Sequence, residues 1–170
     1  FDFGYGGLGV VLEETGKTLV SSPLISTVLV GATAIVQLGN ETQKQDLLPK
    51  IVAGELLTAL ALDEHTNHNP SKIATTATKV DGGYALNGSK TFVLDGHVAN
   101  MLIVASRTSG ETIGEQGISL FLVDANAEGL NVVRTIMVDS RNSSNIQFNN
   151  VVVAEDALLG ELDQGFNGLD

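Results

Sequence analysis

A polar segment at residues 63–68, Asp-Glu-His-Thr-Asn-His, gathers two acids and two histidines directly after an apolar run. His65 and His68 would share one side of a metal site only if the segment were helical, and the asparagines and Pro70 nearby favour a loop. The spacing also matches no H-E-x-x-H pattern, so we expect no metal here. We predict a solvated loop that lines a cleft, because loops on rigid scaffolds often carry binding groups.

No other residues form a catalytic set that spacing alone assigns. The three histidines lie in no nucleophile-elbow motif, so a Ser-His-Asp triad is not indicated. The absence of cysteine removes disulfides, thiolate metal sites and a cysteine nucleophile together. Three arginines are candidate contacts for phosphate or for a partner, although a solvated strand end explains each equally well: Arg107, Arg134 and Arg141.

A literal G-x-G-x-x-G motif occupies residues 4–9. The dinucleotide-binding fingerprint also needs a preceding strand and an acid some twenty positions later. Only three residues precede Gly4, and residues 21–30 hold no acid. We therefore interpret the motif as a flexible loop that enters a helix.

The periodicity of the first third of the chain predicts helices. The second predicted helix covers residues 24–38, and the third predicted helix covers residues 41–52. We expect Gly39 to end the second helix in the left-handed cap conformation and Asn40 to cap the third. Pro49 lies inside the third pattern, so we expect a kink or a split there.

After Gly54, which should stop the third helix, the periodicity changes to that of strands. Asn87-Gly88 is the strongest short hairpin signal in the chain. Seven or eight short strands separated by turns predict an antiparallel barrel, closed or nearly closed. The expected strands lie at residues 56–62, 73–80, 84–86, 91–94, 101–105, 118–123, 130–138 and 146–153.

The composition limits the classes of function. The 170 residues are 43% hydrophobic and 17% charged, as in core-forming globular chains, and the net charge of -11 argues against a nucleic-acid partner. The apolar run 24–38 is too short to span a bilayer, so no membrane span is expected. No signal-peptide pattern opens the chain, and a cytoplasmic location is the default. Both ends look cut, so we treat the chain as a segment.

Six motifs occur in order over nearly the whole chain: Y-G-G-L-G at residues 5–9, L-P-K at 48–50, G-E at 54–55, G-Y-x-L-N-G-x-K at 83–90, G-I-S-L-F-L-V at 117–123 and L-L-G at 158–160. Together they resemble the acyl-CoA dehydrogenase family. The resemblance implies part of an N-terminal helical domain at residues 1–55 and a middle β-barrel domain at 56–160. Residues 161–170 would begin the linker to a C-terminal helical bundle that this chain lacks.

The resemblance also implies a cofactor, a substrate and partners. In the family, FAD lies between the middle domain and the C-terminal bundle, and it receives a hydride from the β carbon of an acyl-CoA thioester after a carboxylate removes the α proton. That carboxylate belongs to the missing bundle, so the catalytic residue is unknown here and the segment by itself is expected to be inactive. The implied electron acceptor is an electron-transfer flavoprotein, and the implied assembly is a homo- or hetero-oligomer.

Two family motifs assign site residues. Aligned without a gap, the T-E-P-G-x-G-S-D loop falls on residues 62–69 and the W-I-T-N-G segment on residues 92–96. Phe92 keeps an aromatic face for the flavin, Leu94 lacks the hydroxyl that would bond flavin N5, and a one-residue shift would move the loop acid to Glu64. The resemblance implies six cofactor-binding residues, with His68 also assigned to substrate: Leu62, Asp63, His68, Phe92, Val93 and Leu94.

These departures from the family pattern leave three functions open. The first is a divergent FAD-dependent acyl-CoA dehydrogenase. The second is a non-catalytic subunit of a heteromeric dehydrogenase, which the altered loop 62–69 and Leu94 favour. The third is another flavoenzyme on this fold, of the monooxygenase or nitroalkane oxidase type.

Overall fold

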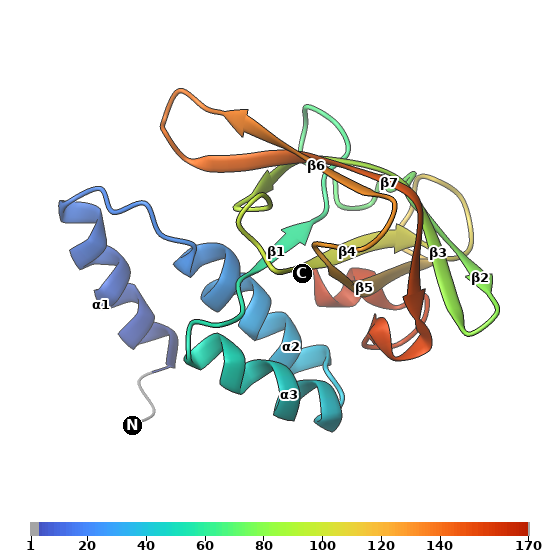
Figure 1. The fold of residues 1–170 in the computed structure, drawn as a ribbon, viewed down its shortest axis with the longest axis horizontal. Helices are drawn as coiled ribbons and strands as arrows, with labels where there is room; N and C mark the ends of the chain where they lie inside the picture. Colours follow the sequence, from blue (N-terminus) through green and yellow to red (C-terminus); the bar gives the residue numbers. More distant parts are fainter. Residues whose placement is uncertain (1–3, 170) are drawn as a thin grey trace.

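The computed structural model describes residues 4–169, which fold into a helical part followed by a sheet (Figure 1). The mixed α+β class expected from the sequence is confirmed, with helices first and strands after them. The helical part consists of α1 (Gly4–Lys17), the π-helix η1 (Ile25–Ala32), α2 (Thr33–Leu38) and α3 (Glu41–Val52).

The glycine-rich motif lies inside α1, which begins at Gly4. Our expectation of a flexible loop is therefore wrong: glycine disfavours a helix by only about 1 kcal/mol per residue, which its neighbours can offset. Because the whole motif is helical, it does not form the strand-to-helix turn of a dinucleotide fingerprint. None of the residues of α1 is buried, and Tyr5 and Val10 are largely exposed.

The apolar run after α1 forms one continuous helical stretch, with η1 leading directly into α2. Gly39 follows it with φ −64° and ψ 143°, so the expected left-handed cap is wrong. Glycine is required there for another reason: a Cβ at Gly39 would lie 2.5 Å from the carbonyl oxygen of Ile35. No helix within residues 4–169 is long and apolar enough to cross a membrane.

Helix α3 begins with the predicted cap. The Asn40 side chain accepts a hydrogen bond from the backbone N–H of Gln43 at 2.9 Å, and the Gln43 side chain accepts one from the backbone N–H of Asn40 at 3.0 Å. Pro49 does not split the helix, which runs unbroken to Val52. Gly54 ends it with φ 74°, as expected.

Eight strands form one sheet, in the hydrogen-bonded order β6-β7-β3-β2-β4-β5-β8, with β1 paired to β4. Short 3₁₀ helices, η2 (Glu155–Ala157) and η3 (Gly165–Gly168), flank the last strand. The strands are β1 (Thr58–Ala61), β2 (Thr76–Val80), β3 (Gly83–Leu94), β4 (Met101–Arg107), β5 (Ile118–Asp124), β6 (Leu130–Ile136), β7 (Asn142–Ala154) and β8 (Leu158–Leu159).

The sheet is not the antiparallel barrel that we expected. Within the described residues its path is open, with β6 at one end and β8 at the other. Strand β4 pairs in parallel with β1 and, at one position, with β2, so the sheet is mixed. Strand count and spacing do not reveal this, because closure depends on which distant strands pair.

The expected hairpin turn at Asn87-Gly88 is also wrong. The turn lies at Asp81-Gly82, and β3 then runs through Asn87-Gly88 without a break. Gly88 has φ 147° at a register shift between β3 and β7, and a Cβ there would lie 2.5 Å from Oγ1 of Thr75. Asn-Gly here marks a bulge and not a strand end.

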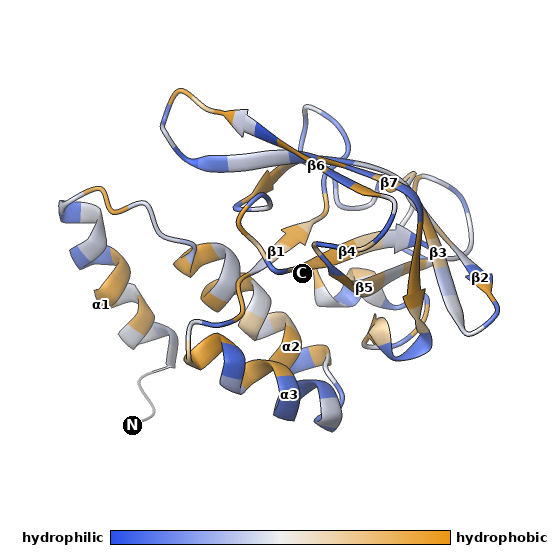
Figure 2. Cartoon of the chain, in the orientation of Figure 1, coloured by the Kyte–Doolittle hydropathy of each residue, from blue (hydrophilic) through white to orange (hydrophobic). Residues whose placement is uncertain are grey.

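The central strand β4 is buried on both faces. Most of its length is coloured as apolar in Figure 2, and its last residues are polar. Leu102 and Val104 belong to a core cluster shared with β3, β5 and β7. Ile103 and Ala105 belong to a second cluster, which includes Ile35 of α2. The sheet is therefore anchored to the helices through β4 and β5, which fixes the junction where the candidate site lies.

Candidate functional site

A cleft of about 220 Å³ opens at the junction between η1, β1 and β3. Ser26 and Val30 line it from η1 and Leu60 from β1. Five of the six predicted cofactor residues also line it: Leu62, Asp63, His68, Phe92 and Leu94. Two segments that lie thirty residues apart in the chain thus come together around one hollow.

Phe92 owes its position to a β-bulge. The register between β3 and β7 shifts between Lys90 and Val93, and Phe92 takes φ 52°, a conformation that a bulky residue rarely adopts. Bulges re-aim side chains next to functional sites. Here the Phe92 ring is turned outward into the cleft and remains 54% exposed.

Val93 is the predicted residue that the structure does not bring to the cleft. Its side chain is 2% exposed and belongs to the core cluster beneath the sheet. Alternation along a strand explains the difference, since Phe92 and Leu94 face the cleft and the residue between them faces inward. Only the backbone of Val93 is left to contact a ligand.

The two polar residues predicted for the site contact each other. Nδ1 of His68 lies 3.1 and 3.0 Å from the two carboxylate oxygens of Asp63. Asp63 also accepts a hydrogen bond from the backbone N–H of Asn69 at 3.3 Å. The acid that lines the cleft is Asp63, while Glu64 turns away from it. In the described residues no group of three or more His, Asp or Glu side chains could hold a metal ion.

Sequence reasoning missed the buried ion pair behind the cleft. Nζ of Lys90 lies 2.8 Å from Oε1 of Glu64, and their side chains are 0% and 5% exposed. Burial lowers the pKa of Lys90 to about 8, although the Glu64 carboxylate opposes that shift. Burial raises the pKa of Glu64, but the Lys90 charge and the hydrogen bonds from Lys90 and Thr75 outweigh it and lower that pKa below its ordinary value. The one sequence feature that could have revealed this pair is Lys90, the lysine of the G-x-K motif.

Arg107 is not available to a phosphate or a partner, which corrects one of our two readings for this arginine. Its side chain is buried and donates hydrogen bonds to the backbone carbonyls of two adjoining loops. Those acceptors are the carbonyls of Ser71, Ile73, Thr112, Gly114 and Gln116. Arg107 therefore holds these loops together.

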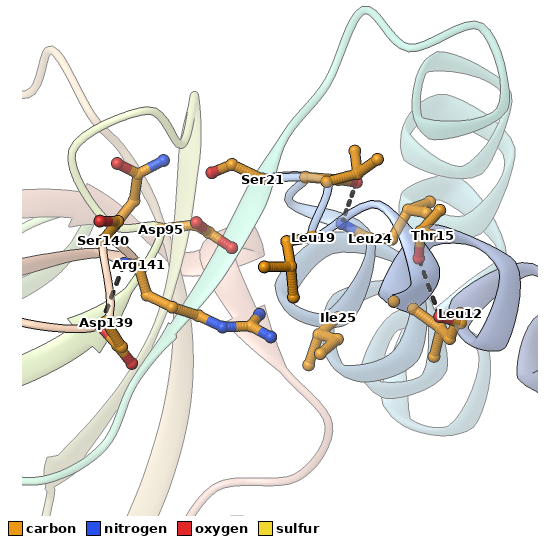
Figure 3. Close-up of a pocket in the computed structure, with 14 residues that line it drawn as sticks. Leu12, Thr15, Leu19, Ser21, Leu24, Ile25, Asp95, Asp139, Ser140 and Arg141 are labelled. Carbon is orange, nitrogen blue, oxygen red and sulfur yellow. Dashed lines mark hydrogen bonds between the residues drawn. The ribbon is translucent and has the colours of Figure 1, made fainter.

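A second, larger cavity of about 500 Å³ lies between the C-terminal part of α1 and the β6–β7 turn (Figure 3). Arg141 reaches into it from that turn, toward Leu19 and Ile25. Asp95 lines it from the end of β3 and accepts a hydrogen bond of 2.6 Å from Ser26. Because Ser26 also lines the cleft, the Ser26–Asp95 pair lies between the two hollows.

The fold and the cleft together define a structural class of protein, in which a helical segment packs on a mixed sheet and an aromatic side chain lines a cleft at their junction. Residues 59–151 match the family model of the acyl-CoA dehydrogenase middle domain, and residues 2–55 match that of the acyl-CoA dehydrogenase N-terminal domain. The chain belongs to the acyl-CoA dehydrogenase family.

Relatives and solved structures agree with this assignment. An acyl-CoA dehydrogenase of Bacillus subtilis (strain 168) is 34% identical over 96% of this chain and 46% of its own length. The structure of an acyl-CoA dehydrogenase from Geobacillus kaustophilus superposes with a TM-score of 0.80 at 34% identity, covering 93% of this chain and 42% of that one. Butyryl-CoA dehydrogenase from Megasphaera elsdenii gives 0.79 at 32% identity, covering 86% and 39%. The chain thus spans less than half the length of these relatives.

Proposed function

We propose that the complete protein is an FAD-dependent dehydrogenase that introduces an α,β double bond into an acyl-CoA thioester. Family membership supports the reaction class, since the similar proteins cited above are named as dehydrogenases of acyl-CoA thioesters. The observation that carries the proposal in this chain is the cleft, where the predicted residues of two distant segments converge around the exposed ring of Phe92.

The residues of the cleft fit a planar, mostly apolar ring. Phe92 offers a half-exposed aromatic face, and Leu62 and Leu94 offer apolar walls beside it. Polar side chains are few: Ser26, Asp63, His68 and Thr91 line the cleft. The Ser26 hydroxyl donates to Asp95 and the Thr91 hydroxyl to the backbone carbonyl of His65. Bound there, FAD would supply the hydride acceptor of the reaction.

The chain's own residues would bind and orient. Phe92 would stack on the ring, and His68, held by Asp63 through Nδ1, would present Nε2 to the ligand. Nε2 would donate a hydrogen bond to a phosphate or to the substrate in the doubly protonated imidazolium form of His68. The apolar walls would exclude water from the reacting atoms. We assign no catalytic base within this segment, because each acid near the cleft already has a partner: Asp63 contacts His68, Glu64 is paired with Lys90, and Asp95 accepts a hydrogen bond from Ser26.

We further propose the organisation that the resemblance implies: a helical domain to residue 55, a middle domain over 56–160, and a linker from 161 toward a helical bundle. An electron-transfer flavoprotein would accept the electrons, and the protein would form a homo- or hetero-oligomer. The end of α3 at Val52 and the start of β1 at Thr58 support the first boundary.

The deciding experiment measures the flavin content of the complete gene product, purified without denaturation and then titrated with FAD. One tightly bound FAD per chain, bleached anaerobically by an acyl-CoA, is the expected result. A folded protein that binds no FAD would contradict the proposal and favour the non-catalytic subunit. Bound FAD that no acyl-CoA reduces would point to another flavoenzyme on this fold.

A further inference from the structure

The buried pair of Lys90 and Glu64 lies directly behind the cleft. Nζ of Lys90 donates to Oε1 of Glu64 at 2.8 Å and to the backbone carbonyl of Leu62 at 3.0 Å. Leu62 is itself a cleft residue. The ammonium thus holds the backbone of the cleft wall from inside the protein, where the Lys90 side chain is fully buried.

Glu64 extends this contact to a third segment. Its carboxylate accepts hydrogen bonds from the backbone N–H groups of Ala74 at 2.6 Å and Thr75 at 2.9 Å, just before β2. Lys90 stands at the last regular pairing position of β3 before the bulge that carries Phe92. One ion pair therefore joins the loop after β1, the entry to β2 and the Phe92 bulge.

A buried ion pair is a poor source of stability, because the desolvation of two charges offsets most of their attraction. Its directional hydrogen bonds do fix geometry, and a ligand site must be held within about 0.5 Å of its productive arrangement. We propose that Lys90 and Glu64 are the positioning residues of the FAD cleft: they fix the Leu62 carbonyl and the 63–69 loop relative to the Phe92 ring. This inference rests on the proposed function, and it names the residues that position the cofactor site.

The charges around Lys90 make the proposal sensitive to pH. Glu64 and, more weakly, Asp63 favour its ammonium form, whereas Arg107 and burial oppose it. With a pKa of about 8, Lys90 loses its proton between pH 7 and pH 9. A neutral amine makes weaker hydrogen bonds than an ammonium does. The grip on the loop should loosen over that interval.

The test uses the full-length protein and three variants. Glu64→Gln/Lys90→Met removes both charges but keeps an amide oxygen for the N–H groups of Ala74 and Thr75. Lys90→Met leaves the buried Glu64 carboxylate without its partner, and it shows how strongly one member of the pair depends on the other. Lys79→Met is the matched control, since Lys79 also pairs with a glutamate, Glu155, but at the surface. The readouts are the FAD dissociation constant and amide hydrogen exchange over residues 62–69, with β5 as the internal reference.

We expect the double variant to fold with a wild-type urea midpoint, to bind FAD about tenfold more weakly, and to exchange its 62–69 amides about tenfold faster than wild type. Lys79→Met should behave as wild type. In the wild type, protection of residues 62–69 and FAD affinity should both fall from pH 7 to pH 9, and both should be flat in the double variant. Wild-type affinity and protection in a folded double variant would overturn the proposal.

Two further outcomes are separated by design. If the double variant fails to fold, the wild-type pH series decides: protection of residues 62–69 that does not change relative to β5 through pH 8 would overturn the inference. If the wild type binds no FAD at all, the proposed function fails, while hydrogen exchange still reports whether the pair positions the loop.

Discussion

At the scale of single residues, the cleft depends on a side chain held in a conformation that its own backbone disfavours. Phe92 has φ 52° and keeps 54% of its surface exposed, although an aromatic residue gains most when it is buried. Strain and exposure together at one residue are found at binding sites, where the surrounding structure enforces them. The same feature makes Phe92 the most direct residue to test.

Replacing Phe92 with alanine should weaken FAD binding about tenfold, or ~1.4 kcal/mol, because the stacking surface is lost. Fluorescence titration of the refolded apoprotein measures the dissociation constant. Val133→Ala is the control, since Val133 on β6 is equally exposed at 54% but lies outside the cleft. Equal affinity in Phe92→Ala and wild type would remove Phe92 from the cofactor site.

Leu94 offers a second test, because it lines the cleft without a polar group. Leu94→Thr should strengthen FAD binding by ~1 kcal/mol, the net value of one added hydrogen bond to the ring edge. Valine has nearly the same shape as threonine but no hydroxyl, so Leu94→Val is the matched control. The assignment of Leu94 fails if the threonine and valine variants bind FAD equally well.

At the scale of elements, β3 organises the site, because it carries one bulge near its middle and a second near its C-terminal end. The first, at Gly88, accommodates Thr75 at the entry to β2; the second presents Phe92. β3 pairs with β7 along nearly its whole length. The position of the cleft wall is therefore set by pairing with a strand about fifty residues away in sequence.

Gly88→Ala should lower the free energy of unfolding by about 3 kcal/mol, because it combines a disfavoured φ with a Cβ placed 2.5 Å from Thr75 Oγ1. Gly82→Ala separates the two effects: Gly82 has φ 75° but no atom within 4 Å of the added Cβ, so a loss of about 1 kcal/mol is expected. Urea unfolding measures both. Equal losses in the two variants would show that the contact with Thr75 has no energetic role.

At the scale of the whole molecule, stability and cofactor binding should respond to pH in opposite directions. The pKa of Lys90 is about 8 in the folded protein and 10.5 in an unfolded chain, so the unfolded state binds more protons between these values. Its contribution to the free energy of unfolding therefore rises from about pH 8 to pH 10.5. Glu64, whose folded pKa is lowered, contributes stability above its ordinary value of 4.5 that is lost as the pH falls through the folded pKa.

Urea unfolding from pH 7.5 to pH 10 tests this sign. Relative to Glu64→Gln/Lys90→Met, the wild type should gain stability as the pH rises, while its FAD affinity declines over the lower part of that range. Comparing the two proteins removes the titration of all other groups. A wild-type curve parallel to that of the variant would mean that Lys90 titrates as an ordinary exposed lysine.

The sequence by itself determined the features that short-range physics controls. Asn40 caps α3 and Gly54 ends it because capping and positive φ depend on a few neighbouring residues. The order of helices and strands follows from periodicity, and the family motifs predicted five of the residues that line the cleft. Val93, the sixth predicted residue, faces the core, which strand alternation explains after the fact.

Only the tertiary structure decided the features that depend on partners distant in the chain. Asn87-Gly88 is a good hairpin turn locally, yet pairing with β7 carries β3 straight through it. Parallel pairing around β4 makes the sheet mixed, and the described path from β6 to β8 is open; strand spacing encodes neither feature. The Lys90–Glu64 pair joins residues twenty-six positions apart. Long-range pairing and burial are properties of the assembled chain, so local preference cannot specify them.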